Sequence, residues 1–178
     1  IDLLNLQIPK RNYELTSENN FKNIRFKNVD YIYEGSSDLI LKNISLEIKK
    51  KDIIGVIGST GSGKTTFLDV LMGLVIPTKG DILLDEEILN LSNINKWHNI
   101  IGHVPQDIYL TDSSILENVA FGMDKKKIDY SSVVEACKKA RIHNTIFLWD
   151  KGYETIVGEK GIKLSGGQKQ RIGIARSL

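Results

Sequence analysis

Residues 58–65 have the types and the spacing of a loop that binds phosphate groups. They read G-S-T-G-S-G-K-T, which fits the pattern G-x-x-x-x-G-K-[ST] without a mismatch. The glycines let backbone N–H groups turn inward around phosphate oxygens, and a helix beginning at Lys64 would direct its own N–H groups at the same anion. Lys64 adds a full positive charge, and the Thr65 hydroxyl is a hard oxygen ligand of the kind that Mg²⁺ prefers. The residues predicted to bind a nucleotide are Gly58, Ser59, Thr60, Gly61, Ser62, Gly63, Lys64, Thr65 and Thr66.

Such a loop is positioned by a strand before it and a helix after it, and the flanking residues predict both. Residues 53–57 read I-I-G-V-I, a short β-branched run that suits a strand buried on both faces. A helical stretch over Thr66–Leu74 follows the loop. A buried strand, a glycine-rich turn and a helix make one unit of an α/β fold. This context favours a nucleotide site over a chance glycine turn, although many phosphate-loop enzymes share it.

A second glycine-containing run lies far downstream, at residues 164–168, and reads L-S-G-G-Q. Its serine and glycines precede an apolar run with helical character that extends to Leu178. A helix that starts here would offer a second anion site, with the Ser165 hydroxyl in reach. Taken alone, the run fits an ordinary loop and helix cap equally well.

Taken together, the two runs resemble the ATP-binding-cassette (ABC) ATPases, whose signature is L-S-G-G-Q; the resemblance extends from about residue 21 to residue 178. It implies that ATP and Mg²⁺ are the cofactors. It also implies a head-to-tail dimer, in which the signature of one ATPase domain closes over the ATP held by the phosphate loop of another. The residues that take this γ-phosphate role by position are Ser165, Gly166, Gly167 and Gln168.

Two further site residues follow from the resemblance. Tyr33 stands where the family places an aromatic ring that stacks on adenine, with Tyr31 as the competing candidate and an ordinary strand aromatic as the plain alternative. Because stacking needs only the face of the ring, Tyr33→Phe is expected to leave ATP affinity nearly unchanged. Gln106 matches the catalytic-site glutamine that contacts Mg²⁺ and the attacking water; otherwise it is a polar loop residue. Thr65 and Gln106 are therefore the predicted metal ligands.

Residues 82–86, which read I-L-L-D-E, imitate the family's apolar strand followed by Asp-Glu. They come before Gln106, where the resemblance implies a peripheral β-hairpin, so Asp85 and Glu86 are not expected to be catalytic. The catalytic strand and the switch histidine are expected beyond Leu178. The chain on its own is therefore expected to bind nucleotide with little or no turnover. His98, His103 and His143 are expected to be structural or exposed.

The remaining patterns indicate a β-rich front part and a helical back part. Alternating apolar residues predict strands near 24–33 and 39–48. Shorter strand candidates are Gly80–Leu84, Glu86–Leu91 and Ile100–Val104. Polar capping residues predict short helices that begin at Ser113 or Ser114 and at Ser131, and a further short helix is expected over residues 145–149.

The predicted fold class is α/β: a phosphate-loop ABC ATPase core with an N-terminal antiparallel β subdomain and an α-helical signature subdomain. The C-terminal part of that domain is expected to lie beyond this chain. The expected parts are a linker from a presumed transmembrane domain at 1–20, the β subdomain and phosphate-loop core at 21–110, the helical subdomain at 111–165 and the signature helix at 166–178.

Composition excludes several classes. The chain of 178 residues is 41% hydrophobic and 26% charged, with a net charge of +2, so it has neither the basic bias of a nucleic-acid binder nor the composition of a membrane-embedded chain. No apolar run reaches the roughly 18 residues that a membrane-spanning helix needs. The single cysteine, Cys137, excludes an internal disulfide and is expected to be buried.

Several segments resemble ABC exporters. They are residues 114–122, which follow the glutamine loop, and residues 155–161, where Ile156 replaces the usual glutamate. Residues 101–110 are close to flippases of lipid-linked oligosaccharides and polysaccharides. The implied function is ATP hydrolysis that powers export or flipping at the cytoplasmic face of a membrane. The implied partners are a second ABC ATPase domain and a transmembrane domain, without nucleic acid. The alternatives are a non-transport ABC ATPase and a nucleotide-binding fragment without turnover.

Overall fold

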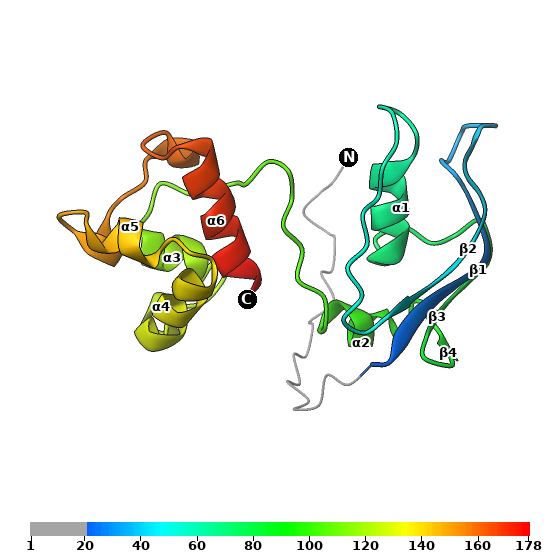
Figure 1. Cartoon of the computed structure of the whole chain (residues 1–178), viewed down its shortest axis with the longest axis horizontal. Helices are drawn as coiled ribbons and strands as arrows, with labels where there is room; N and C mark the ends of the chain where they lie inside the picture. The colour runs from blue at the N-terminus through cyan, green and yellow to red at the C-terminus, as the bar shows by residue number, and fades with distance from the viewer. Residues whose placement is uncertain (1–20) are drawn as a thin grey trace, which may run out of the picture. The chain divides into compact units, whose positions relative to one another are not determined.

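The computed structural model describes residues 21–178, so the linker expected at 1–20 lies outside the described residues. The chain forms two compact units (Figure 1). The first unit ends at Ile101 and the second runs from Gly102 to Leu178. Each unit is described below by itself. The subdomain boundary expected between residues 110 and 111 stays a prediction.

The first unit is built on an antiparallel sheet, as the alternating apolar residues predict. Its strands are β1 (Asn23–Ile32), β2 (Leu39–Lys49), β3 (Lys79–Leu84) and β4 (Glu87–Ile88). Their order in the sheet is β2-β1-β3-β4, so β1 has a neighbour on both sides. Phe26 lies opposite Leu46 of β2 and Ile82 of β3, which places three apolar side chains at one level of the sheet.

Helix α1 (Lys64–Leu71) supplies the other half of this core. The ring of Phe67 lies 5.3 Å from that of Phe26, and Val70 is fully buried. Burial of such side chains contributes about 1.5–3 kcal/mol each, so the sheet and α1 stabilise one another. The buried core residues of the first unit are Ile24, Phe26, Val29, Tyr31, Leu41, Val70, Ile82 and Trp97.

A short helix that the sequence patterns did not indicate, α2 (Ile94–His98), packs beside the end of α1. Trp97 donates its indole N–H to the carbonyl oxygen of Leu71 at 2.7 Å, and His98 Nε2 lies 2.9 Å from the carbonyl oxygen of Met72. These side chains satisfy carbonyl groups that a helix end leaves without an intrahelical partner. The contacts join residues 26 positions apart, so local sequence patterns carry no sign of them.

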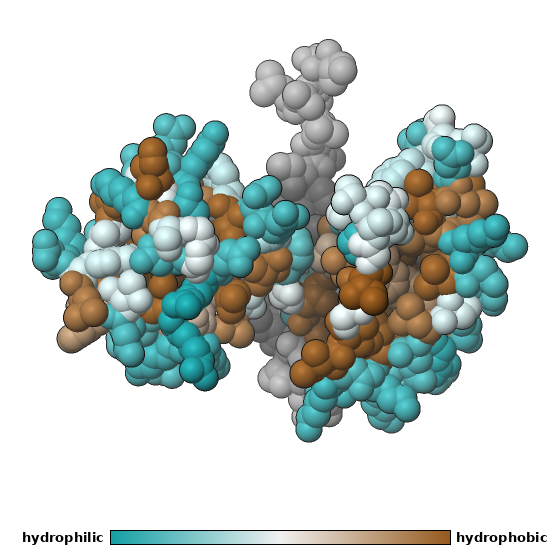
Figure 2. Space-filling view, turned by 45° about the horizontal axis from the view of Figure 1, so that its top comes forward, coloured by the Kyte–Doolittle hydropathy of each residue, from teal (hydrophilic) through white to brown (hydrophobic). Residues whose placement is uncertain are grey.

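Two expected strands are wrong. Residues 53–57 have no regular secondary structure, with Ile53 fully exposed and Ile57 94% exposed, and residues 100–104 likewise form no strand. A strand exists only through hydrogen bonds to a neighbouring strand, and within the described part of the chain no strand pairs with either segment. The apolar side chains of Ile53, Ile54, Val56 and Ile57 are therefore exposed. Figure 2 shows that hydrophobic side chains reach the surface between hydrophilic ones.

The second unit is helical, as expected. Its helices are α3 (Ile115–Val119), α4 (Tyr130–Lys139), α5 (His143–Phe147) and α6 (Gly166–Ser177), with 3₁₀ turns η2 (Lys125–Lys127), η3 (Gly152–Glu154) and η4 (Glu159–Gly161). Ser114 caps α3, which confirms that start. The start expected at Ser131 is wrong, because the Asp129 carboxylate accepts the N–H groups of Ser131 and Ser132 and so caps α4.

Helix α6 packs against α3 and α4 around a single apolar core. Cys137 is fully buried in this core, as predicted. The fully buried amide of Asn118 accepts the Thr111 N–H at 3.0 Å and donates to neighbouring backbone carbonyls, so a polar group inside the core is satisfied. In the part of the chain that the structure describes, no helix has the length and apolar character needed to cross a membrane.

Candidate functional site

The phosphate loop, residues 58–63, leads directly into α1. Gly61 and Gly63 have φ angles of 81° and 87°, in the left-handed region that glycine adopts most readily. A Cβ atom on Gly63 would also lie 3.1 Å from the carbonyl oxygen of Ile40. Ser62 donates its N–H to the carbonyl oxygen of Ser59 at 3.2 Å, which closes a turn inside the loop. The loop conformation therefore depends on glycine at these two positions.

Lys64, the first residue of α1, folds its side chain back over the loop. Its Nζ donates to the carbonyl oxygens of Gly58 at 2.9 Å and Ser59 at 2.7 Å. An ammonium group has three donors, so its charge and one donor stay available to an incoming anion. The Lys64 ammonium group therefore lies beside both the loop and the N-terminus of α1. The sequence pattern predicts this arrangement for a phosphate site.

The two threonines that follow have different surroundings. The Thr65 side chain is exposed, and its hydroxyl makes no hydrogen bond to another described residue. An oxygen in that state suits a hard cation such as Mg²⁺. Thr66 is only 5% exposed, and its hydroxyl lies 2.9 Å from that of Tyr33. Thr66 therefore makes a contact that the sequence did not indicate.

Of the two tyrosines considered for base stacking, only Tyr33 offers an open ring. Tyr33 is 44% exposed, whereas Tyr31 is 9% exposed and belongs to the core. The two ring centroids are 5.0 Å apart at an interplanar angle of 86°, an edge-to-face arrangement. A nucleobase can stack only on a ring face that it can reach, so the geometry favours Tyr33.

A hollow of about 450 Å³ lies beside the loop, between β2 and residues 54–58. Its walls are mainly apolar and include Leu46, Ile48 and Phe67, while Gly63 and Lys64 lie at its edge. Apolar walls provide no donors for phosphate oxygens. The polar groups of the loop, rather than this hollow, are therefore the part suited to an anion.

In the second unit, the residues of the L-S-G-G-Q run form the start of α6. Ser165 Oγ accepts the Gln168 N–H at 3.3 Å, and Gln168 Oε1 accepts the Ser165 N–H at 2.8 Å, which is a reciprocal capping box. Gly166 and Gly167 are exposed, and a Cβ atom added to either would meet nothing beyond its own helix turn within 4 Å. The run therefore caps a helix and also presents an open N-terminus, so the two interpretations of the sequence are compatible.

Gln106 also belongs to the second unit. It lines a hollow of about 430 Å³ together with Gly166, Lys160 and Lys169, so the glutamine and the first turn of α6 border the same space. Thr65 belongs to the first unit. The metal site predicted for Thr65 and Gln106 together stays a prediction.

Asp85 and Glu86 lie in the turn between β3 and β4, which confirms the predicted hairpin. Asp85 Oδ1 accepts the backbone N–H groups of Lys22 at 2.7 Å and Asn23 at 3.0 Å. Glu86 is paired with Arg25 at 3.6 Å on the surface. These carboxylates hold the hairpin against the start of β1. Within residues 21–178, no cluster of three or more His, Cys, Asp or Glu side chains could hold a metal ion.

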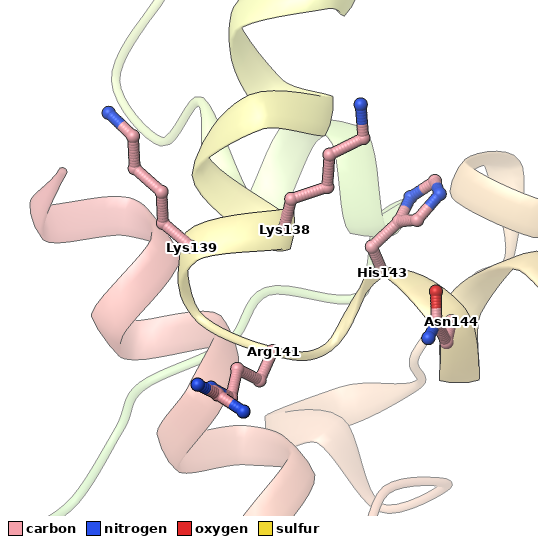
Figure 3. A pocket seen from close by; sticks show the side chains of 5 residues that line it. All are labelled: Lys138, Lys139, Arg141, His143 and Asn144. Carbon is pink, nitrogen blue, oxygen red and sulfur yellow. The ribbon is translucent and has the colours of Figure 1, made fainter.

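A basic hollow of about 440 Å³ lies at the junction of α4 and α5, lined by Lys138, Lys139, Arg141, His143 and Asn144 (Figure 3). Figure 3 shows that the lysine, arginine and histidine side chains point in different directions rather than toward one point. Lys138 pairs with Glu135 at 2.8 Å, and His143 Nδ1 lies 2.9 Å from the Tyr153 hydroxyl. Diverging cations do not enclose an anion, so this hollow does not compete with the loop as a phosphate site.

Comparison with known proteins decides the family. The model of the ABC transporter family matches residues 41–178, which include both the phosphate loop and the L-S-G-G-Q run. The chain belongs to the ABC transporter family. The sequence-based prediction of family and fold is therefore confirmed, including the antiparallel sheet of this ABC transporter chain, whose strands β1 and β2 precede the loop.

Relatives of this ABC transporter chain include proteins named for translocation. It is 43% identical to the leukotoxin translocation ATP-binding protein LktB of Mannheimia glucosida, over 87% of this chain and 22% of LktB. It is 40% identical to the alpha-hemolysin translocation ATP-binding protein HlyB of Escherichia coli, over 97% of this chain and 23% of HlyB. The chain thus spans about a quarter of the length of these relatives.

A solved structure shares the fold. It is that of a bacterial Atm1-family ABC exporter with ATP bound, with a TM-score of 0.79 and 34% sequence identity, over 89% of this chain and 27% of that one. This likeness agrees with the ABC transporter fold.

Proposed function

We propose that this chain binds Mg²⁺-ATP as the ATPase part of an ABC exporter. The observation that carries the proposal is the phosphate loop. Gly61 and Gly63 take left-handed conformations, and the Lys64 ammonium lies across the loop at the N-terminus of α1. Three features that attract phosphate thus coincide: a glycine-rich loop with two left-handed residues, a helix N-terminus and a cation.

Each part of ATP has a counterpart in the first unit. The triphosphate would bind residues 58–65, with Lys64 near the terminal phosphates. The adenine would stack on the open face of Tyr33, an interaction that contributes about 1–3 kcal/mol per base elsewhere. The exposed Thr65 hydroxyl would supply one ligand to Mg²⁺, whose remaining ligands are typically phosphate oxygens and water.

In the intact protein we infer ATP hydrolysis coupled to export at the cytoplasmic face of a membrane. Support comes from the names of LktB and HlyB, both translocation ATP-binding proteins, and from the exporter with ATP bound. The open start of α6 at Ser165–Gly167 would act on the ATP of a second ATPase domain in a head-to-tail dimer, and Gln106 would act beside the metal. A transmembrane domain, in the same or a partner chain, completes the proposed assembly.

A binding module without turnover is the second candidate. The observation that favours it is the environment of Asp85 and Glu86, whose carboxylates are engaged in the hairpin and in a surface ion pair. Phosphoryl transfer needs positioned phosphates, a metal and an oriented water. The loop would position the phosphates, and Thr65 would supply one ligand to the metal.

The test is a calorimetric titration of the chain with Mg²⁺-ATP. Lys64→Ala should weaken binding sharply, because charge-assisted contacts to phosphate are the strong ones. Lys139→Ala is the matched control, since this exposed lysine lies in the basic hollow and should leave the affinity unchanged. Equal affinity of the wild type and Lys64→Ala would mean that the loop is not the nucleotide site.

A further inference from the structure

The hydroxyl groups of Tyr33 and Thr66 form a contact that links the end of the sheet to α1. Their oxygens are 2.9 Å apart across 33 positions of sequence, and either hydroxyl can be the donor. Thr66 is buried in the first turn of α1, while Tyr33 follows the last residue of β1 and is 44% exposed. The distance is that of a well-formed hydrogen bond between hydroxyls.

A second contact holds the same ring from another side. The buried Tyr31 ring meets Tyr33 edge-to-face, with 5.0 Å between the centroids. A tyrosine side chain has only two torsions that place its ring. One contact at the hydroxyl and one against the ring therefore restrain the orientation of Tyr33, although nearly half of its surface is open to solvent.

Thr66 lies in the same helix turn as the proposed phosphate-binding groups. Lys64, Thr65 and Thr66 are consecutive residues in the first turn of α1, and the first two carry the groups proposed to bind the triphosphate and Mg²⁺. A bond from Thr66 to Tyr33 ties the aromatic ring to the same helix turn that carries the phosphate-binding groups. This hydrogen bond therefore restrains the distance between the Tyr33 ring and the phosphate loop.

We propose that Thr66 is a positioning residue, which orients the Tyr33 ring so that the site favours a nucleoside triphosphate over a bare triphosphate. This inference rests on the proposed nucleotide site. It assigns the Thr66 hydroxyl to Tyr33 rather than to the phosphates. It also replaces the expectation that Tyr33→Phe is nearly silent, because the phenylalanine ring keeps its face but loses the bond that orients it.

The test compares two ligands, Mg²⁺-ATP and Mg²⁺-tripolyphosphate, in calorimetric titrations of the whole chain. Tyr33→Phe and Thr66→Val should each weaken ATP binding about threefold to tenfold, the range that the loss of one hydrogen bond produces. Neither change should alter the affinity for tripolyphosphate, which has no base. The double variant should lose no more than either single variant, since both remove the same bond.

Two further variants keep the result independent of folding. Thr66→Ser restores a hydroxyl and should recover most of the loss seen in Thr66→Val. Tyr130→Phe removes an exposed hydroxyl in the second unit and should bind ATP as the wild type does. Wild-type ATP affinity in Tyr33→Phe would overturn the proposal. So would additive losses in the double variant, or a matching loss of tripolyphosphate binding in Thr66→Val.

Failure of the underlying nucleotide site would look different. In that case the wild type would bind neither ligand, or Lys64→Ala would bind both as the wild type does. A functional site without the proposed restraint would instead retain its dependence on Lys64 and show no coupling between Tyr33 and Thr66.

Discussion

Trp97 donates its indole N–H to the carbonyl oxygen of Leu71, the last residue of α1, at 2.7 Å. The bond satisfies one of the carbonyl groups that every helix leaves unpaired at its C-terminus. The opposite end of this helix carries Lys64 and the phosphate loop. Helix α2 therefore holds one end of the element whose other end forms the candidate site.

Trp97→Phe should lower the free energy of unfolding by about 1 kcal/mol, because it keeps an aromatic ring in the core but leaves the Leu71 carbonyl without its donor. Urea denaturation followed by circular dichroism measures the change. Trp149→Phe is the control, since the Trp149 indole N–H makes no hydrogen bond to another described residue. Equal losses in the two variants would show that ring volume, rather than the hydrogen bond, accounts for the effect.

Ser165→Ala should destabilise the second unit by about 1 kcal/mol through the loss of its N-cap. The hydroxyl accepts the Gln168 N–H at the exposed start of α6, and alanine cannot replace that acceptor. Thermal or urea unfolding provides the measurement, with Ser37→Ala, at an exposed position outside helices and strands, as the comparison. An unchanged midpoint in Ser165→Ala would mean that solvent replaces the cap without cost.

Acid should weaken α4 through Asp129. Hydrogen bonds from Ser132 and Ser131 lower the pKa of this carboxyl from its usual value of 3.8 to about 2. Because the pKa is lower in the folded state, the charged cap stabilises the fold above pH 3.8, and this contribution is lost as the pH falls toward 2. The expected result is a urea midpoint that declines over this range.

Asp129→Asn provides the control for that decline. The amide oxygen can still accept backbone N–H groups, but it does not titrate. The variant should therefore show a smaller change of urea midpoint between pH 3.8 and 2 than the wild type. An identical pH profile in both proteins would assign the acid sensitivity to other carboxylates.

Glu86→Gln should leave the rate of phosphate release by the chain at the wild-type value, because Glu86 lies in a surface hairpin and pairs with Arg25. Surface ion pairs of this kind contribute about 0–1 kcal/mol, so folding should be unaffected as well. A phosphate-release assay with Lys64→Ala as the inactive reference measures this. Loss of a robust turnover in Glu86→Gln would identify that carboxylate as catalytic.

The local parts of the site were predictable from sequence. Gly63 occurs where the loop pattern needs glycine and adopts the left-handed region, as Gly61 inside the loop also does. The start of α6 at Ser165 follows from capping chemistry within four residues. The hairpin around Asp85 was placed by the family resemblance, because its sequence alone imitates a catalytic strand.

The parts that could not be predicted depend on contacts between distant residues. The bond between Tyr33 and Thr66 spans 33 positions, and that between Trp97 and Leu71 spans 26. Residues 53–57 show the reverse case, because their composition is typical of a buried strand whatever neighbours surround them. Apolar, β-branched composition indicates a tendency to form a strand. The backbone hydrogen bonds of a sheet also require a partner strand within hydrogen-bonding distance.

The exposed run at residues 53–57 has a practical consequence for handling the polypeptide. It is β-branched, uncharged and free of proline, and its backbone groups make no hydrogen bond to another described residue. Segments with these properties promote edge-to-edge aggregation. Residues 53–57 should therefore limit the solubility of the chain at high protein concentration. Ile53→Lys would place a charge at the fully exposed Ile53 and should reduce aggregation through this segment.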